Sequence, residues 1–277
     1  MKQKYSDYHE LVEAVRNEYL NNAGAHKQGK GKKEVKLGWV DCCEEINLYT
    51  YWQGLKYEDN KPYIKYMLVA QDWGNPGKVQ EENKDFFERI KRINQGDTEI
   101  QYVTERDLTI APTDRNLVRL FEVLGYKDII SSRRCPDLFF TNFCLGYRGG
   151  NESGNMGKRL MMMDKEFFYS LCCILKPEKI LCLGKLTFSC VFETLSEKRV
   201  SSIDGYSKDY NDFVSMHKPI QVSYEGITSK VYALAHCGAM GTLNRNKIRK
   251  TRGLVTDPSI TDPLQRQIED WEAVKNS

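Results

Sequence analysis

The sequence predicts an α/β protein of three layers (α/β/α), with helices on both faces of a central, mostly parallel, four-stranded sheet. Short apolar runs alternate along the chain with segments of helical periodicity, which is the pattern of parallel strands joined by crossover helices. In addition, 40% of the 277 residues are hydrophobic and 29% are charged, a balance that excludes a disordered or membrane-embedded chain. A chain of this length can bury a full core, so we expect a single domain over residues 1–277.

The N-terminal region, residues 1–60, begins with an amphipathic helix, because apolar side chains recur at helical spacing over residues 5–22. A loop rich in glycine and lysine follows, and its lysines are either a solvated surface or contacts to phosphate groups. The first strand covers residues 64–70 and stops at a Gly/Pro turn. Residues 78–114 are charged and poorly patterned, and we interpret them as a surface insertion.

Strands and helices alternate through the rest of the chain. Asp114 caps a helix that Gly125 ends, and a strand at 137–143 runs into a second insertion at 145–160. The elements predicted after it are a helix at 164–176, a strand at 179–183, a helix from Gly184 to about Leu195, a strand at 230–235, a basic helix after His236 and a capped helix near the C-terminus.

Charge and cysteine content restrict the setting of the protein. The net charge of +3 is too small to indicate a nucleic-acid partner by itself. The N-terminus lacks the apolar core of a secretory signal, and no apolar stretch is long enough to span a bilayer. We therefore expect the nine cysteines to be reduced thiols in a cytoplasmic, monomeric protein without a membrane partner. Because there is no Cys-x-x-Cys pair and the four histidines show no ligand spacing, we expect neither a metal nor a cofactor.

Three of the four predicted strands end at polar residues, and parallel sheets bind ligands beyond the carboxyl ends of their strands. Asp72 follows the first strand and is either a turn cap or a carboxylate that faces a cleft. Asn142 lies in an apolar run, so it should be buried and hydrogen-bonded; it either pins a loop or reads a base through its amide. His236 follows the fourth strand and is either structural or catalytic. None of the three decides the function alone.

Four short motifs are more informative when they are taken in order along the chain. They are the turn AQDWG at 70–74, the apolar strand FFTN at 139–142, the strand and glycine KILCLG at 179–184, and the strand end LAHCG at 234–238. In this order they resemble the motifs of the uracil-DNA glycosylase superfamily, and the resemblance covers residues 64–252. The chain departs from those motifs at Trp73, where the superfamily has proline, and at Cys237-Gly238, where it has Pro-Ser.

The resemblance implies a monofunctional DNA glycosylase, which flips a base out of DNA and hydrolyses its N-glycosidic bond to leave an abasic site. In that chemistry Asp72 would stabilise the cationic sugar and orient or deprotonate the attacking water. His236 would donate a hydrogen bond to O2 of the departing base, assisted by the backbone N–H of Gln71. Asn142 would read the Watson–Crick edge of the flipped base.

The resemblance also bears on the substrate. Gly74 stands where strict uracil enzymes carry a tyrosine that excludes 5-substituted bases, which implies a pocket open beside C5. Phe86 or Phe87 lies where the superfamily places an aromatic that stacks on the base, although either residue is equally suited to a helix core. The implied substrate is uracil or a 5-substituted pyrimidine, including a hypermodified cytosine of a phage genome. In the second case the enzyme would act in antiviral defence.

The segment after His236 is implied to contact DNA. The superfamily inserts an apolar wedge from this segment into the minor groove. Met240 matches the wedge by position, and Leu243 is the alternative. The basic residues that follow would lie along the phosphates of double- or single-stranded DNA, or would simply form a solvated face; they include Arg245, Lys247 and Arg249.

Two other functions fit the same residues. The first is a catalytically silent glycosylase-like module that binds modified or single-stranded DNA, although a pure binder needs neither Asp72 nor His236. The second is an α/β enzyme that acts on free nucleosides or nucleotides. A steep salt dependence of duplex binding would argue against the second, because a free nucleoside lacks the phosphate track.

Overall fold

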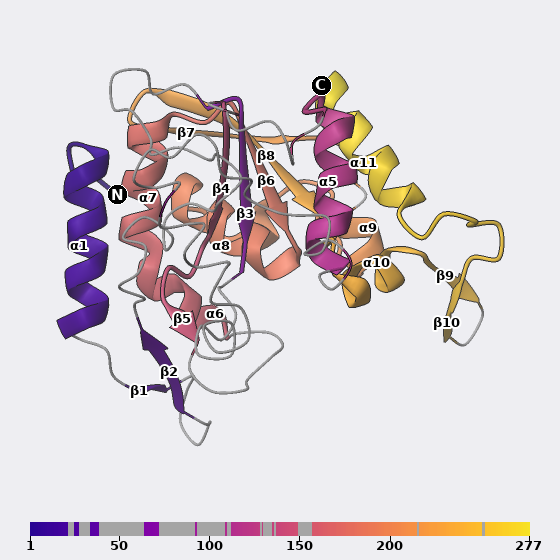
Figure 1. Ribbon diagram of the computed structural model, residues 1–277, viewed down its shortest axis with the longest axis horizontal. Helices are drawn as coiled ribbons and strands as arrows, with labels where there is room; N and C mark the ends of the chain where they lie inside the picture. Colours follow the sequence, from indigo (N-terminus) through magenta and orange to yellow (C-terminus); the bar gives the residue numbers. More distant parts are fainter. Residues whose placement is uncertain are drawn as a thin grey trace.

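The computed structural model describes residues 1–21, 25–27, 34–38, 64–71, 92, 109, 112–127, 129, 135, 137–148, 157–214, 216–250 and 253–277. At its centre is a five-stranded sheet with the order β4-β3-β6-β8-β7 (Figure 1). These strands are β3 (Tyr66–Ala70), β4 (Leu138–Asn142), β6 (Lys179–Leu183), β7 (Ile220–Tyr224) and β8 (Ile227–Leu234). Strands β3, β4, β6 and β8 run parallel to one another, and β7 at one edge runs antiparallel to β8. The predicted α/β class and the mostly parallel sheet are confirmed.

The edge strand β7 is the difference from the predicted four-stranded sheet. It joins β8 through a two-residue turn at Glu225 and Gly226, whose φ angles are 43° and 75°. Such a tight hairpin turn needs positive φ at both positions, which Asn and Gly adopt most readily. Because Glu225 occupies the first of these positions, the turn carries a weak signal in the sequence.

Helices cover both faces of the sheet and give the predicted three layers. On one face lie α1 (Tyr8–Asn21), α7 (Lys165–Leu175) and α8 (Lys185–Ser196), and on the other lie α5 (Pro112–Leu124) and α11 (Gln265–Asn276). Alternate strand residues enter the two cores: Met67 and Val69 pack with the first group of helices, and Leu68 with the second. Figure 1 shows α1 and α11 on opposite sides of the strands.

Local sequence explains where α5 begins and ends. The helix starts at Pro112, so Asp114 lies in its first turn rather than at its cap as predicted. Its end agrees with the prediction, because Gly125 has a φ of 106° that few other residues adopt. The N–H groups of Gly125 and Tyr126 donate to the carbonyls of Glu122 and Phe121, both at 3.0 Å. This pair of hydrogen bonds is the Schellman ending of a helix.

Two segments differ from the predicted secondary structure. The lysine-rich segment predicted as a loop contains β1 (Ala25–Lys27) and β2 (Glu34–Gly38), which pair with each other, and β2 also pairs with β5 (Tyr147–Arg148). After α10 (Ala239–Arg245), the segment predicted as a basic helix is instead an antiparallel hairpin of β9 (Lys247–Lys250) and β10 (Gly253–Thr256). The helix does not continue because the carbonyl of Asn246 accepts the N–H of Asp257 at 3.0 Å, which starts strand pairing.

The remaining short elements are α6 (Lys158–Met161), α9 (Tyr210–Val214) and 3₁₀ turns at Met162–Asp164 and Val200–Ser202. Within the described ranges, no helix is long and apolar enough to cross a membrane. The cysteines in these ranges are buried free thiols. Burial raises the pKa of the Cys172 and Cys182 thiols, which keeps them in the unreactive protonated form.

Candidate active site

The carboxyl ends of the four parallel strands meet at one edge of the sheet. Ala70 of β3 is in register with Asn142 of β4, and Leu183 of β6 is in register with Leu234 of β8. The residues that follow, Gln71, Gly184 and His236, therefore lie at the same edge as Asn142. The structure thus brings together three sequence-predicted site residues from distant parts of the chain.

The order of the strands reverses between β3 and β6. The chain passes from β3 to its neighbour β4 on one side, and then to β6 on the other side. Open α/β sheets bind ligands outside the carboxyl ends of the strands at such a reversal. Gln71 follows β3 and Gly184 follows β6, so a ligand bound at this reversal would lie beside both.

Asn142 is buried, as predicted, with 3% of its surface exposed. The pairing of β3 and β4 continues beyond it, because the N–H of Phe143 donates to Ala70 O at 2.9 Å and that of Cys144 donates to Gln71 O at 3.0 Å. The backbone on both sides of Asn142, and that of Ala70 and Gln71, is therefore held by strand-like hydrogen bonds. Such a rigid backbone is what a residue that reads a base requires.

A buried carboxylate fixes the turn that follows Asn142. Asp164 accepts the N–H of Leu145 at 2.7 Å and the hydroxyl of Tyr19 at 2.8 and 2.6 Å. Burial raises the pKa of Asp164 to about 6, against these hydrogen bonds, which lower it. Gly146 packs on Tyr19 so closely that a Cβ there would lie 2.2 Å from the ring. The sequence alone carries no signal for this anchor, because its members are far apart in the chain.

The ring of His236 is held in one tautomer. The backbone N–H of Gly238 donates to His236 Nδ1 at 2.9 Å, so in the neutral imidazole the proton is on Nε2. A Cβ at Gly238 would lie 3.0 Å from this ring and 3.1 Å from Thr113 Oγ1 at the start of α5. The backbone of His236 also makes a hydrogen bond to the hydroxyl of Tyr210. This hydrogen bond lowers the pKa of Tyr210, whereas burial, the larger effect, raises it. His236 is therefore oriented so that Nε2 is a hydrogen-bond donor.

Side chains from α5 and α11 hold the backbone around His236. Gln267 Nε2 donates to the carbonyls of Ala235 and His236, both at 3.1 Å, and its Oε1 accepts the Thr242 hydroxyl at 2.9 Å. Asn116 Nδ2 donates to the next carbonyl, that of Cys237, at 2.7 Å. Neither Gln267 nor Asn116 was predicted from the sequence as a positioning residue. The signal that could have indicated them is a polar residue on the apolar face of each helix.

The close packing of α10 on the backbone of His236 depends on a glycine within the helix. A Cβ at Gly241 would lie 2.0 Å from the carbonyl oxygen of His236. On the outer side of the same short helix, Met240 is 68% exposed and Leu243 is 43% exposed. Both side chains are thus exposed on this helix, and the wedge role of either one remains a prediction.

Arg245 does not have the role predicted for it. It is buried, and its guanidinium makes two hydrogen bonds to Asp270 of α11, Nε–Oδ2 at 2.8 Å and Nη2–Oδ1 at 2.9 Å. Because this guanidinium is buried as well as paired, it could reach a phosphate only by leaving the buried carboxylate of Asp270. Lys247 is half-buried and donates to Asn244 Oδ1 at 2.9 Å, and Arg249 lies in β9. DNA contact by Lys247 and Arg249 remains a prediction.

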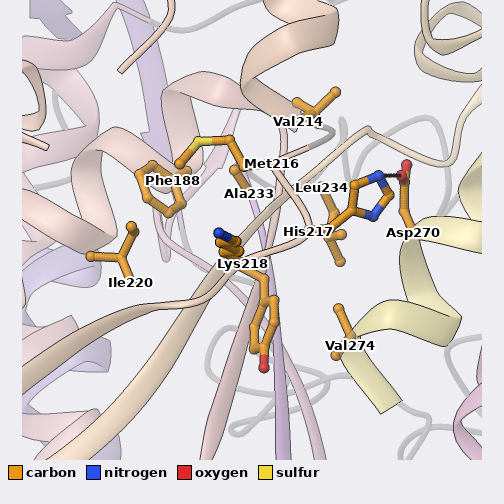
Figure 2. Close-up of a pocket in the computed structure, with 11 residues that line it drawn as sticks. Phe188, Val214, Met216, His217, Lys218, Ile220, Ala233, Leu234, Asp270 and Val274 are labelled. Carbon is orange, nitrogen blue, oxygen red and sulfur yellow. Dashed lines mark ion pairs between the residues drawn. The ribbon is translucent and has the colours of Figure 1, made fainter. Parts of the chain in front are cut away.

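Asp270 also lines a small pocket, together with His217 and Lys218 (Figure 2). The imidazole of His217 faces Asp270, with Nε2 at 3.6 Å from Oδ1. None of the predicted site residues lines this pocket, so we place the candidate active site at the sheet edge instead.

Four predicted site residues, Asp72, Gly74, Phe86 and Phe87, lie outside the described residues. Asp72 directly follows Gln71 in the sequence. In the part of the chain that the structure describes, no group of three or more His, Cys, Asp or Glu side chains could hold a metal ion. Along the described edge, Asn142 ends β4 and His236 follows β8, with β3 and β6 between them. No protein-family model matches the chain, and no curated protein is similar to it.

Proposed function

We propose that this protein is a monofunctional DNA glycosylase that flips a base out of DNA and hydrolyses its N-glycosidic bond, leaving an abasic site. The observation that supports this most is the tautomer of His236, in which Nε2 carries the proton, together with its place at the sheet edge shared with Gln71 and Asn142. The proposed enzyme is a cytoplasmic monomer that acts without a metal or another cofactor.

In the proposed reaction, the bond between C1′ of the deoxyribose and the ring nitrogen of the base breaks, and its electron pair leaves with the base. Water adds to C1′, and Asp72 stabilises the cationic sugar and takes the proton of that water. His236 donates a hydrogen bond from Nε2 to O2 of the base, where negative charge develops. The departing base then takes up a proton, which balances the hydrolysis.

The other predicted site residues have supporting roles in this proposal. Asn142, on the rigid end of β4, would read the base edge, and the Gln71 N–H would assist His236. Gly74 would leave room beside C5, and Phe86 or Phe87 would stack on the base. The proposed substrate is therefore uracil or a 5-substituted pyrimidine, and a hypermodified phage base would make the enzyme an antiviral one.

The DNA would lie across α10. Met240, the more exposed of the two apolar side chains on this helix, would fill the space left by the flipped base, with Leu243 as the alternative. Lys247 and Arg249 would contact phosphates, whereas Arg245 is excluded from this role by its pairing with Asp270.

Base release from defined DNAs tests the proposal. The panel contains uracil, a thymine mismatch, 5-hydroxymethylcytosine and a glucosylated phage genome, with abasic sites scored by alkaline cleavage. We expect His236→Gln to lower the release rate roughly 10²- to 10³-fold, the typical effect of losing one such donor. Asp72→Asn should abolish most release while DNA binding survives. His9→Gln, at a histidine that is 70% exposed on α1, is the matched control and should behave like the wild type.

Each outcome of the panel has a distinct meaning. Release of uracil assigns the protein to repair, and release only from the modified phage DNA assigns it to defence. Wild-type release by Asp72→Asn would overturn the proposed mechanism. Release from none of the DNAs, with salt-sensitive binding intact, would replace the enzyme by the silent binding module.

A further inference from the structure

We propose that the β9–β10 hairpin is a ribbon that docks on double-stranded nucleic acid beside the candidate active site. The inference deepens the proposed function and rests on it for the position of the duplex across α10. The hairpin is a two-stranded sheet separate from the central sheet, with Ile248 opposite Val255 and Lys247 opposite Thr256. In Figure 1 it projects from the body of the molecule beyond α10.

The exposed apolar side chains of the protein gather on this part of the chain. Five large hydrophobic side chains are exposed in the described ranges, and four of them belong to α10 or the hairpin: Met240, Leu243, Leu254 and Val255. Leu254 is 52% exposed and Val255 is 38% exposed, and every residue of β10 is exposed. A strand this accessible with apolar residues at its centre is typical of a contact surface.

The base of the hairpin is fixed to the body, so its orientation is set. Asn246 Nδ2 donates to Pro263 O at 2.6 Å, and Asn211 Nδ2 donates to Lys247 O at 3.0 Å. At the other strand, Asp257 pairs with Arg266 of α11 at 2.6 Å. A partner would therefore meet a ribbon whose direction is already determined, which lowers the entropic cost of binding.

Charge indicates which partner fits. β9 carries Lys247, Arg249 and Lys250, and no acidic residue occurs in the sequence from Asn246 to Thr256. A basic strand repels a second copy of itself, as lysines on edge strands generally do. It is attracted to the phosphates that border a nucleic-acid groove, and the major groove of a duplex admits a two-stranded ribbon. Apolar contacts from β10 to base edges would complete the fit.

The structure allows the hairpin to be removed cleanly. Asn246 O and Asp257 N are 3.0 Å apart, so residues 247–256 can be replaced by a two-residue Asn-Gly turn that preserves this hydrogen bond. A second variant, Arg249→Glu with Lys250→Glu, keeps the hairpin and reverses two charges. The matched control is Lys198→Glu with Arg199→Glu, at exposed cations beyond the far end of α8.

The measurement is the Kd for an unmodified 20-base-pair duplex as a function of salt, with a single strand of the same length as comparison. We expect excision to weaken duplex binding roughly 10- to 100-fold and to make the salt slope shallower by roughly 4, one for each cation lost with residues 247–256. The charge reversal should also weaken duplex binding. Single-strand binding should change less, and the control should match the wild type.

Other results would overturn the proposal. Unchanged duplex affinity after both changes would do so, as would a wild-type protein that binds no duplex. Normal duplex binding with loss of self-association would assign the hairpin to a second copy instead. The proposed glycosylase fails separately: if no DNA of the panel releases a base but excision still weakens duplex binding, the hairpin proposal stands without the enzyme.

Discussion

The side-chain Nε2 of Gln267 lies 3.1 Å from the backbone carbonyl oxygen of His236 and donates a hydrogen bond to it. The same amide nitrogen also donates to the carbonyl of Ala235, and the whole side chain is buried. A helix near the C-terminus therefore sets the backbone that orients the imidazole. This relationship makes Gln267 a positioning residue for the candidate active site.

Replacing Gln267 by methionine should leave two carbonyl groups without their donor. We expect the free energy of unfolding to fall by about 1–3 kcal/mol, the cost of buried acceptors that lose a partner. The rate of base release should fall more than duplex affinity does, because His236 would lose its orientation rather than its charge. Urea denaturation and single-turnover release measure the two effects.

The control for that change lies on the same helix. Gln265 is exposed, and Gln265→Met should leave both stability and release near wild-type values. If Gln267→Met lowered stability but left the release rate per folded molecule unchanged, the role of Gln267 would be structural only.

The ion pair of Arg245 with Asp270 should contribute strongly because it is buried. Arg245→Met leaves the buried Asp270 carboxylate with only the longer contact to His217 and should cost about 3–5 kcal/mol of unfolding free energy. The double variant Arg245→Met/Asp270→Leu should recover much of that loss. Arg119 pairs with Asp262 at the surface, so Arg119→Met should cost under about 1 kcal/mol. Urea denaturation of the two single variants and the double variant measures the coupling between Arg245 and Asp270. If the losses of unfolding free energy in the single variants simply added up in the double variant, the prediction would be wrong.

Gly241 should be intolerant of even one methyl group. Within a helix, Gly to Ala is normally stabilising by about 1 kcal/mol. Here the new Cβ would lie 2.0 Å from His236 O, so we expect Gly241→Ala to destabilise by about 1–3 kcal/mol. Gly253 has open space around its position, and Gly253→Ala should stay within about 0.5 kcal/mol of the wild type. Thermal melts of the two variants make the comparison, and equal melting temperatures would contradict it.

The buried Asp164 predicts a pH dependence of stability. Its pKa is raised by burial from 3.8 to about 6 in the folded protein. The stabilising contribution of its proton is therefore complete below about pH 4 and is lost as the pH rises through about 6, an effect of roughly 3 kcal/mol. The amide side chain introduced by Asp164→Asn does not titrate. The free energy of unfolding of this variant, relative to that of the wild type, should therefore rise by about the same amount between pH 4 and pH 7.

Urea denaturation at several pH values measures this difference directly. Asp204→Asn, at an exposed aspartate, is the control and should run parallel to the wild type. A constant difference between Asp164→Asn and the wild type from pH 4 to pH 7 would show that Asp164 does not bind a proton in this range.

Periodicity alone was enough to locate most of the sheet and its main helices. The strands at Tyr66–Ala70 and Lys179–Leu183 are buried on both faces, which continuous apolar runs indicate. The C-terminal end of α5 and the turn after β8 follow from glycines that the sequence displays. The β9–β10 hairpin escaped prediction because its pairing, Arg249 with Leu254, joins two short segments whose composition does not favour a strand over a helix.

What the sequence by itself determined is therefore local: the α/β class, the alternation of strands and helices, and the presence of Asn142 and His236 at strand ends. The tertiary structure decided which residues those side chains meet. Gln267 reaches the backbone of His236, Asp270 takes up the charge of Arg245, and Tyr19 binds Asp164 across 145 positions of sequence. Local propensity comes from interactions within a few residues, whereas each of these contacts depends on how distant helices pack on the sheet.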